Sequence, residues 1–259
     1  MNLFDTHTHL NDKTFFNNIA AVVARCLANG IKKMIVVGYD LDSSLKAIDL
    51  AYRFPGIIYA AVGIHPTECN DITPQDLERL AALLDESCVV ALGEIGLDYH
   101  WQTVEPDRQK EIFIKQLKIA KEKQKPVIIH SREAIKDTYD ILKQEDVASI
   151  GGVMHSFSSS PEMAKEFIKL KLFISISGVI TFKNNNKTRQ VVKDIPLEHL
   201  LLETDCPYLT PEPYRGQVNY PDYTYYVAEE IAKVKNLSVT QVIAATYENA
   251  CQLFKITAK

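Results

Sequence analysis

The sequence lacks the features that mark secreted, membrane-spanning or disulfide-stapled proteins. The sequence has an odd number of cysteines, and no two of them form a Cys-x-x-Cys motif. They are Cys26, Cys69, Cys88, Cys206 and Cys251. No apolar run approaches the roughly 20 residues of a membrane span, and no cationic segment followed by an apolar run opens the chain. We therefore expect a soluble cytoplasmic protein with reduced thiols.

An excess of positive charge is also missing. The chain has 29 Lys and Arg against 33 Asp and Glu, a formal net charge of -4, which argues against a basic protein that coats nucleic acid but permits a local phosphate site. Repeats, low-complexity runs and linkers are absent, and 46% hydrophobic residues over 259 positions can bury a full core. We expect one domain over residues 1–259, with no membrane contact and no obligate protein partner.

Short apolar runs alternate with longer amphipathic ones along the whole chain. Several of the short runs are β-branched and nearly unbroken, such as Met34–Val37, which is typical of parallel strands covered on both faces. The candidate strands are Leu3–His7, Lys33–Gly38, Ile57–Gly63, Val89–Glu94, Pro126–His130, Gly152–His155, Leu172–Ser177 and Leu200–Asp205.

Helical patterns separate these strands and carry recognisable ends. Asn29-Gly30 ends the first, Asp42 caps the second, and Thr73-Pro74 and Glu105-Pro106 open the next two. Further helices fit 133–144, 161–170, 188–193, 223–235 and 239–254, the last capped by Ser238. Eight strands, each followed by a helix, predict a (β/α)₈ TIM barrel. The alternative is an open doubly wound sheet, but no G-x-G-x-x-G follows the first strand.

Histidines gather at the predicted carboxyl ends of strands, where barrel enzymes carry their chemistry. His7 and His9 are two apart on an extended strand, so their imidazoles lie side by side. The five histidines at strand ends are His7, His9, His65, His130 and His155. His100 lies in the loop after the fourth strand, and His199 precedes the eighth and belongs to the barrel floor. Five imidazoles on one rim predict a metal site.

Acidic residues complete this predicted site. Glu94 ends the fourth strand, and Glu203 and Asp205 alternate at the end of the eighth, so both can face inward. Four histidines and two carboxylates exceed the needs of one tetrahedral ion but suit two divalent ions about 3.5–4 Å apart that share a carboxylate. The predicted ligands are His7, His9, Glu94, His130, His155 and Asp205. Glu94 is the expected bridge, and Asp205 lies nearer the rim, where it can also accept a proton from water.

Charge narrows the substrate class. Two divalent ions and two carboxylates leave a charge of about +2, which favours an anionic substrate over a neutral amide. Arg132 and Arg215 are candidate phosphate ligands through charge-assisted hydrogen bonds, with surface salt bridges as the alternative. Trp101, the only tryptophan, is either a packed anchor of its loop or a surface on which a base stacks.

Six stretches together resemble the TatD family of metal-dependent deoxyribonucleases, within the amidohydrolase-like barrel superfamily. They are Phe4–His9 (FDTHTH), Val62–Pro66 (VGIHP), Gly93–Tyr99 (GEIGLDY), Ile129–Arg132 (IHSR), His155–Ser158 (HSFS) and Leu202–Leu209 (LETDCPYL). The resemblance implies that His7, His9, Glu94 and Asp205 hold one metal, and Glu94, His130 and His155 a second.

The resemblance also implies magnesium, the ion associated with family activity, although imidazole-rich sites prefer zinc, manganese, iron or nickel. The cofactors expected here are therefore two divalent ions such as Mg, Mn or Zn. One stretch departs from the family pattern: Val218-Asn219-Tyr220-Pro221 keeps the asparagine and proline but lacks a basic and an acidic residue.

The expected activity is hydrolysis of DNA phosphodiester bonds by water. Asp205 is the expected base, Glu94 is required for metal binding, and His65 hydrogen-bonds the phosphate or supports the leaving group. The alternative is hydrolysis of another ester or an amide, as by an amidohydrolase, a lactonase or an aminoacyl-tRNA deacylase. A third possibility is a non-catalytic metal-dependent binding protein.

Overall fold

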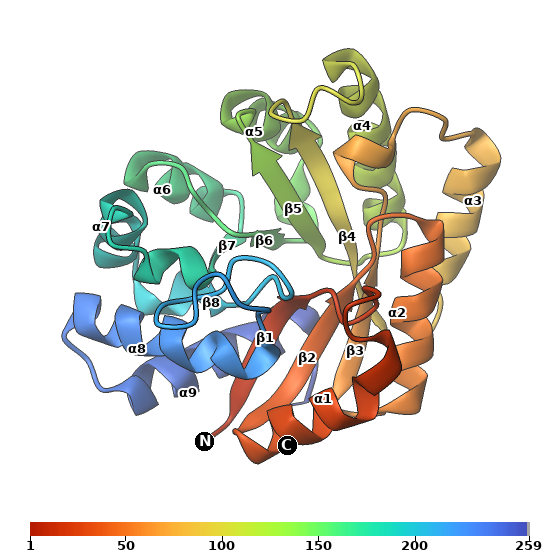
Figure 1. Ribbon diagram of the computed structural model, residues 1–259. Helices are drawn as coiled ribbons and strands as arrows, with labels where there is room; N and C mark the ends of the chain where they lie inside the picture. The colour runs from red at the N-terminus through yellow and green to blue at the C-terminus, as the bar shows by residue number, and fades with distance from the viewer. Residues whose placement is uncertain (258–259) are drawn as a thin grey trace.

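Eight parallel strands lie side by side in chain order and curve into a barrel in the computed structural model, which describes residues 1–257 (Figure 1). They are β1 (Leu3–Thr8), β2 (Ile31–Val37), β3 (Ile58–Val62), β4 (Val89–Asp98), β5 (Val127–Arg132), β6 (Gly152–Met154), β7 (Leu172–Ile176) and β8 (Leu200–Leu202). A parallel bridge between Thr8 and Cys206 joins the end of β1 to the segment after β8. The amide of Asp205 also donates to the carbonyl of His7 at 2.9 Å. The predicted single-domain (β/α)₈ barrel is confirmed.

Helices cover the outside of the barrel and follow the strands in sequence (Figure 1). They are α1 (Ile19–Ala28), α2 (Leu41–Arg53), α3 (Pro74–Leu83), α4 (Pro106–Glu122), α5 (Ile135–Gln144), α6 (Pro161–Lys169), α7 (Asn186–Asp194), α8 (Thr224–Lys235) and α9 (Val239–Phe254). Short 3₁₀ turns lie at Phe16–Asn18 (η1), Pro66–Glu68 (η2), Val147–Ser149 (η3), Gly178–Thr181 (η4), Leu197–His199 (η5) and Pro221–Tyr223 (η6). Over residues 1–257, no helix combines the length and the apolar character needed to cross a bilayer.

Local side-chain hydrogen bonds move several element ends away from their predicted positions. Helix α2 begins four residues early because Asp40, not Asp42, is its cap: the Asp40 carboxylate accepts from the amide of Ser43 at 2.6 Å. Strand β8 ends at Leu202 rather than Asp205, because the amide of Thr204 donates to the Asp5 carboxylate at 3.0 Å. Strand β4 continues past Glu94 to Asp98, where it still pairs with β5.

The barrel interior and the helix-covered exterior form separate hydrophobic clusters. The interior cluster takes residues from seven strands (Phe4, Ile35, Val37, Ala61, Ala91, Ile128, Val153 and Leu201) and packs them against α9. Phe4 touches both Tyr247 and Phe254, with ring centroids 6.0 and 6.4 Å apart. Asn249 binds the carbonyls of Leu197 and Leu200 at the start of β8. Helix α9 therefore closes the amino-terminal end, leaving the carboxyl ends of the strands for chemistry.

Glycine lets β4 approach β5 where these strands carry site residues. Gly96 has φ +145°, a conformation almost restricted to glycine, and pairs with His130. A Cβ added at this position would overlap the carbonyl oxygen of His130. The close approach of the two strands at this position therefore depends on the missing side chain.

We predict that Gly96→Ala lowers the free energy of unfolding by about 2–4 kcal/mol, because it adds a backbone clash to an unfavourable φ. Gly56→Ala is the matched control: Gly56 also has positive φ, +78°, but nothing lies within 4 Å of its added Cβ. That control is expected to lose about 1 kcal/mol. Urea unfolding of both variants measures the difference, and equal losses would contradict the packing argument.

Candidate metal centre

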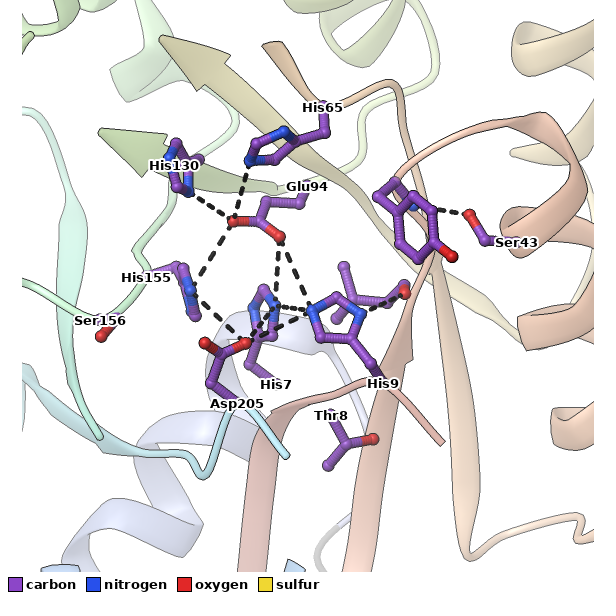
Figure 2. A network of polar contacts seen from close by, with 12 residues as sticks. His7, Thr8, His9, Ser43, His65, Glu94, His130, His155, Ser156 and Asp205 are labelled. Atoms are coloured by element: carbon purple, nitrogen blue, oxygen red, sulfur yellow. Dashed lines mark hydrogen bonds and ion pairs between the residues drawn. The ribbon is translucent and has the colours of Figure 1, made fainter. Parts of the chain in front are cut away.

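The predicted ligands converge at the carboxyl ends of the strands (Figure 2). His7 lies in β1 and His9 just after it, while Glu94 and His130 lie in β4 and β5. His155 is the first residue after β6, and Asp205 follows β8 by three residues. His65, predicted to lie outside the ligand set, joins the same cluster from the start of η2 after β3.

Glu94 occupies the middle of this cluster, and its two oxygens face different partners (Figure 2). Oε1 lies 2.8 Å from Nδ1 of His130 and 3.7 Å from Nε2 of His155. Oε2 lies 3.4 Å from Nε2 of His7 and 3.9 Å from Nε2 of His9. This is the arrangement a bridging carboxylate requires.

Asp205 closes the cluster on the side of β1. Its Oδ1 lies 3.3 Å from Nε2 of His9, 3.7 Å from that of His7 and 3.9 Å from that of His155. The Nε2 atoms of His7 and His9 are themselves 3.2 Å apart. Asp205 has φ +59°, so the chain turns sharply after β8 at the residue whose carboxylate faces the imidazoles.

Most of these imidazoles are held from behind through their second nitrogen. Nε2 of His130 lies 2.9 Å from Oδ2 of Asp98, and Nδ1 of His9 lies 3.1 Å from the carbonyl of Val37. Nδ1 of His155 is 3.0 Å from Oε1 of Glu203, close enough for an ion pair although the angle is poor for a hydrogen bond. Such outer partners fix ring orientation in metal sites and leave the other nitrogen for the ion.

Asp98 and Glu203 were not assigned roles from the sequence, although strand periodicity points to both. Asp98 is four residues after Glu94 on an extended strand, and Glu203 is two residues before Asp205, so each shares a face with a predicted ligand. His7 differs from the other rings. Its Nδ1 is buried without a hydrogen-bond partner among residues 1–257, and its ring stacks on His155 at a centroid distance of 3.7 Å.

Opposite charges shift the ionisation of the cluster. Burial alone raises the pKa of Glu94, but the imidazoles of His155, His7 and His130 hold this pKa well below its usual range. Burial lowers the pKa of His155, but the carboxylates of Glu203, Glu94 and Asp205 outweigh burial and raise it to about 10. Without a cation, the anionic cluster is therefore balanced by protons on imidazoles.

His65 behaves differently from the rings that face two carboxylates. Burial, followed by the charge of His130, lowers the pKa of His65 to about 3, so this ring is neutral. Its Nδ1 accepts from the amide of Thr67 at 3.2 Å, which places the ring proton on Nε2. Nε2 lies 3.9 Å from Oε1 of Glu94. His65 therefore offers a neutral hydrogen-bond donor to the mouth of the site.

The donor set fits divalent cations. Among residues 1–257, four groups of three side chains have ligand atoms within 4.8 Å of one another. Two of them fall within the predicted ligand sets, His7 with His9 and Glu94, and Glu94 with His130 and His155, while the other two are His7 with His155 and Glu203, and His65 with Asp98 and His130. The first two groups both contain Glu94, and both combine imidazole nitrogen with carboxylate oxygen, as sites for zinc, manganese, iron and nickel do. The Nε2 atoms of His7 and His9 face each other at 3.2 Å, so a cation beside both would be bound by one nitrogen of each ring.

The remaining predicted residues lie on the rim rather than in the cluster. The guanidinium carbon of Arg132 lies 5.5 Å from the ring centroid of Trp101, and that of Arg215 lies 4.1 Å from the ring centroid of Phe182. Trp101 is 54% exposed, so the interpretation of this residue as a packed loop anchor is wrong. His199 lies in η5 before β8, on the barrel floor as expected.

The departure from the family pattern falls in the segment that follows β8. Asn219, which the chain keeps, is buried and donates to the carbonyls of Thr204 at 2.9 Å and Tyr208 at 2.6 Å. It therefore ties this segment to the backbone beside Asp205. Val218 is exposed, so the position that lacks the basic residue faces solvent.

A parallel barrel with imidazoles and carboxylates gathered at the carboxyl ends of its strands is an architecture of metal-dependent hydrolases. Comparison with known proteins identifies the family within this class. The family model described as TatD related DNase matches residues 4–255. The chain therefore belongs to the TatD family of metal-dependent hydrolases.

Relatives match over nearly the full length. The chain is 44% identical to YabD of Bacillus subtilis, described as an uncharacterized metal-dependent hydrolase, over 98% of this chain and 99% of the relative. It is 38% identical to YcfH of Escherichia coli, described in the same words, over 100% and 97%. Among solved structures, the TatD homologue YJJV of Escherichia coli matches with a TM-score of 0.93 and 32% identity, covering 98% of each chain.

We predict that cation binding releases protons and strengthens as pH rises. His155 has a pKa of about 10, so its imidazole is protonated at pH 8 in the metal-free protein. A ring nitrogen can bind a metal only after it has lost its proton, so metal binding must release this proton. Apparent zinc affinity should rise by up to about tenfold per pH unit for each proton displaced. Calorimetric titration in buffers of different ionisation enthalpy measures the number of protons.

Glu203→Gln is the matched variant for this experiment, because it removes one charge that raises the pKa of His155. It should release fewer protons at pH 8 than the parent. A binding enthalpy that does not depend on the buffer would contradict proton displacement, whatever the affinity.

Proposed function

We propose that this chain is a deoxyribonuclease that uses two divalent cations to hydrolyse phosphodiester bonds in DNA. The observation that carries the proposal is the position of Glu94, whose two oxygens face two separate sets of imidazoles. Paired cations that share one carboxylate are common in nucleases and phosphatases. The match to a family described as TatD related DNase supports the same reaction class.

The predicted ligands form two sets that share Glu94. His7, His9, Glu94 and Asp205 would hold one ion, and Glu94, His130 and His155 the other. When bound, such ions lower the pKa of a coordinated water and neutralise charge on a phosphate. The imidazole content favours zinc, manganese, iron or nickel over magnesium.

The two carboxylates behind the rings change the charge count made from the sequence. Glu94 and Asp205 alone would leave two divalent ions with a net charge of about +2. When Asp98 and Glu203 are included, four carboxylates balance the charge of the two ions. Asp98 and Glu203 are almost fully buried and lie on the far side of His130 and His155. On this count the site with two cations is neutral overall, and the cations themselves carry the positive charge that an anionic phosphodiester would meet.

Asp205 is the residue best placed to accept a proton from water. Its side chain is 14% exposed, against 6% for Glu94. Its carboxylate remains ionised because, although burial opposes this, the charge of His155 and the hydrogen bond to His9 lower its pKa. The neutral Nε2–H of His65 is directed to the same mouth, where it would donate to a phosphate oxygen.

Location in the cytoplasm also belongs to this proposal. All five cysteines are unpaired thiols, and four of them are buried. Thiols in this state are expected in a reducing compartment.

We predict that Glu94→Ala remains folded but loses bound cation and lowers DNA hydrolysis by at least about 100-fold, because both ligand sets lose their shared carboxylate. Glu68→Ala, which removes an exposed glutamate from η2 beside the same mouth, is the control and should keep both. Circular dichroism, metal analysis and hydrolysis of a defined oligonucleotide measure the three properties.

Equal nuclease rates for Glu94→Ala and the parent would refute the assignment. A panel of phosphodiester, carboxylic ester, lactone and amide substrates, assayed with defined metals, tests the substrate class separately. Turnover of an amide or carboxylic ester with none of DNA would retain the metal site but overturn the nuclease proposal.

A further inference from the structure

The loop that joins β4 to α4 presents the only tryptophan of the chain to solvent. Trp101 is 54% exposed, although aromatic rings of this size are usually largely covered. In Figure 1 this loop lies beside the start of α5. The contact between His100 Nδ1 and Glu133 Oε1, at 2.7 Å, joins the two segments.

The backbone of this loop is anchored to the barrel although the tryptophan side chain is exposed. Oδ1 of Asp98 accepts from the amides of His100 and Trp101 at 2.9 and 3.0 Å. The buried Gln109 accepts from the amide of Asp98 at 2.8 Å and donates to the carbonyls of Asp98 and Val104. The exposure of Trp101 is therefore set by the loop's own hydrogen bonds.

Asp98 connects this loop to the candidate metal centre. Its other oxygen, Oδ2, lies 2.9 Å from Nε2 of His130, whose Nδ1 faces Glu94. One carboxylate thus fixes both the tryptophan backbone and an imidazole of the site. The contacts of Asp98 therefore hold the backbone of Trp101 at a fixed position relative to the imidazole of His130.

A guanidinium accompanies the exposed ring. Arg132 ends β5, pairs with Asp98 across the strands and places its guanidinium carbon 5.5 Å from the centroid of Trp101. Arg132 is exposed, and no carboxylate within residues 1–257 forms an ion pair with it, so its charge is free for a phosphate. Arg132 is two residues beyond His130, roughly 7 Å along the strand, and this is about the span of one or two nucleotides.

We propose that Trp101 and Arg132 form a stacking platform for an unpaired base of a DNA strand, beside the phosphodiester bound at the candidate metal centre. The inference rests on the proposed function and deepens it, because it names a single-stranded segment as the substrate. An exposed indole with a neighbouring guanidinium stacks on the face of any base. In a duplex those faces are covered by neighbouring base pairs, so the platform selects unpaired nucleotides.

Fluorescence tests this proposal directly, since all tryptophan emission comes from Trp101. The probe is a five-nucleotide single strand with phosphorothioate linkages, which resist hydrolysis, titrated into the zinc-loaded protein. Saturable quenching is expected. An abasic strand of the same length and charge should give little quenching, and so should the blunt duplex. Equal quenching by the abasic strand, or none by any strand, would overturn the platform.

Kinetics supply a second readout. Trp101→Ala is expected to raise KM for a single-stranded oligonucleotide by roughly 5- to 100-fold, with kcat changed by less than about threefold, because stacking binds the strand away from the reacting bond. Trp101→Phe should recover most of the affinity. Tyr52→Ala is the matched control, since Tyr52 is 53% exposed but lies at the far end of α2. Unchanged KM in Trp101→Ala would contradict the proposal.

The two experiments distinguish failure of the platform proposal from failure of the nuclease proposal. Base-dependent quenching in a protein that hydrolyses no DNA would overturn the nuclease proposal and retain the platform as a nucleotide-binding site. DNA hydrolysis with no effect of Trp101→Ala on KM would retain the nuclease and overturn the platform.

Discussion

The buried carboxylate of Glu94 faces five imidazoles at the carboxyl ends of the strands. The arrangement of this end of the barrel balances the negative charge of that carboxylate. An unpaired charge in this position would cost several kcal/mol. Imidazoles from β1, β5 and the segments after β3 and β6 surround it at 2.8–3.9 Å. Protons on some of these rings supply the balance without cations, and divalent ions replace those protons on binding. Charge, protonation and metal affinity are therefore coupled at this site.

Precision at this site comes from the residues behind the rings and from the backbone. Asp98, Glu203 and the carbonyl of Val37 hold the outer nitrogens of three imidazoles. Gly96 lets β4 and β5 approach closely enough for Glu94 and His130 to meet. Helix α9 closes the opposite end of the barrel. Stability and chemistry thus occupy opposite ends of the same strands, as in other barrels of this class.

Much of this arrangement could be predicted from the sequence, because strand period and strand order are local patterns. Alternation of apolar runs and helices indicated the barrel, and His-x-His indicated paired imidazoles on one face. The end of β8 could not be predicted, since it depends on a contact between Asp5 and Thr204, which are 199 residues apart. The sequence could not decide between a packed and an exposed Trp101 for the same reason: the position of its loop depends on hydrogen bonds that Asp98 and Gln109 make after folding.

Anomalous diffraction from crystals grown with zinc tests the central claim most directly, because it locates the ions and counts them without any assay of activity. We expect two peaks, one among His7, His9, Glu94 and Asp205 and the other among Glu94, His130 and His155, with the Glu94 carboxylate between them. A single peak that makes no contact with Glu94, or peaks confined to other parts of the molecule, would contradict the account.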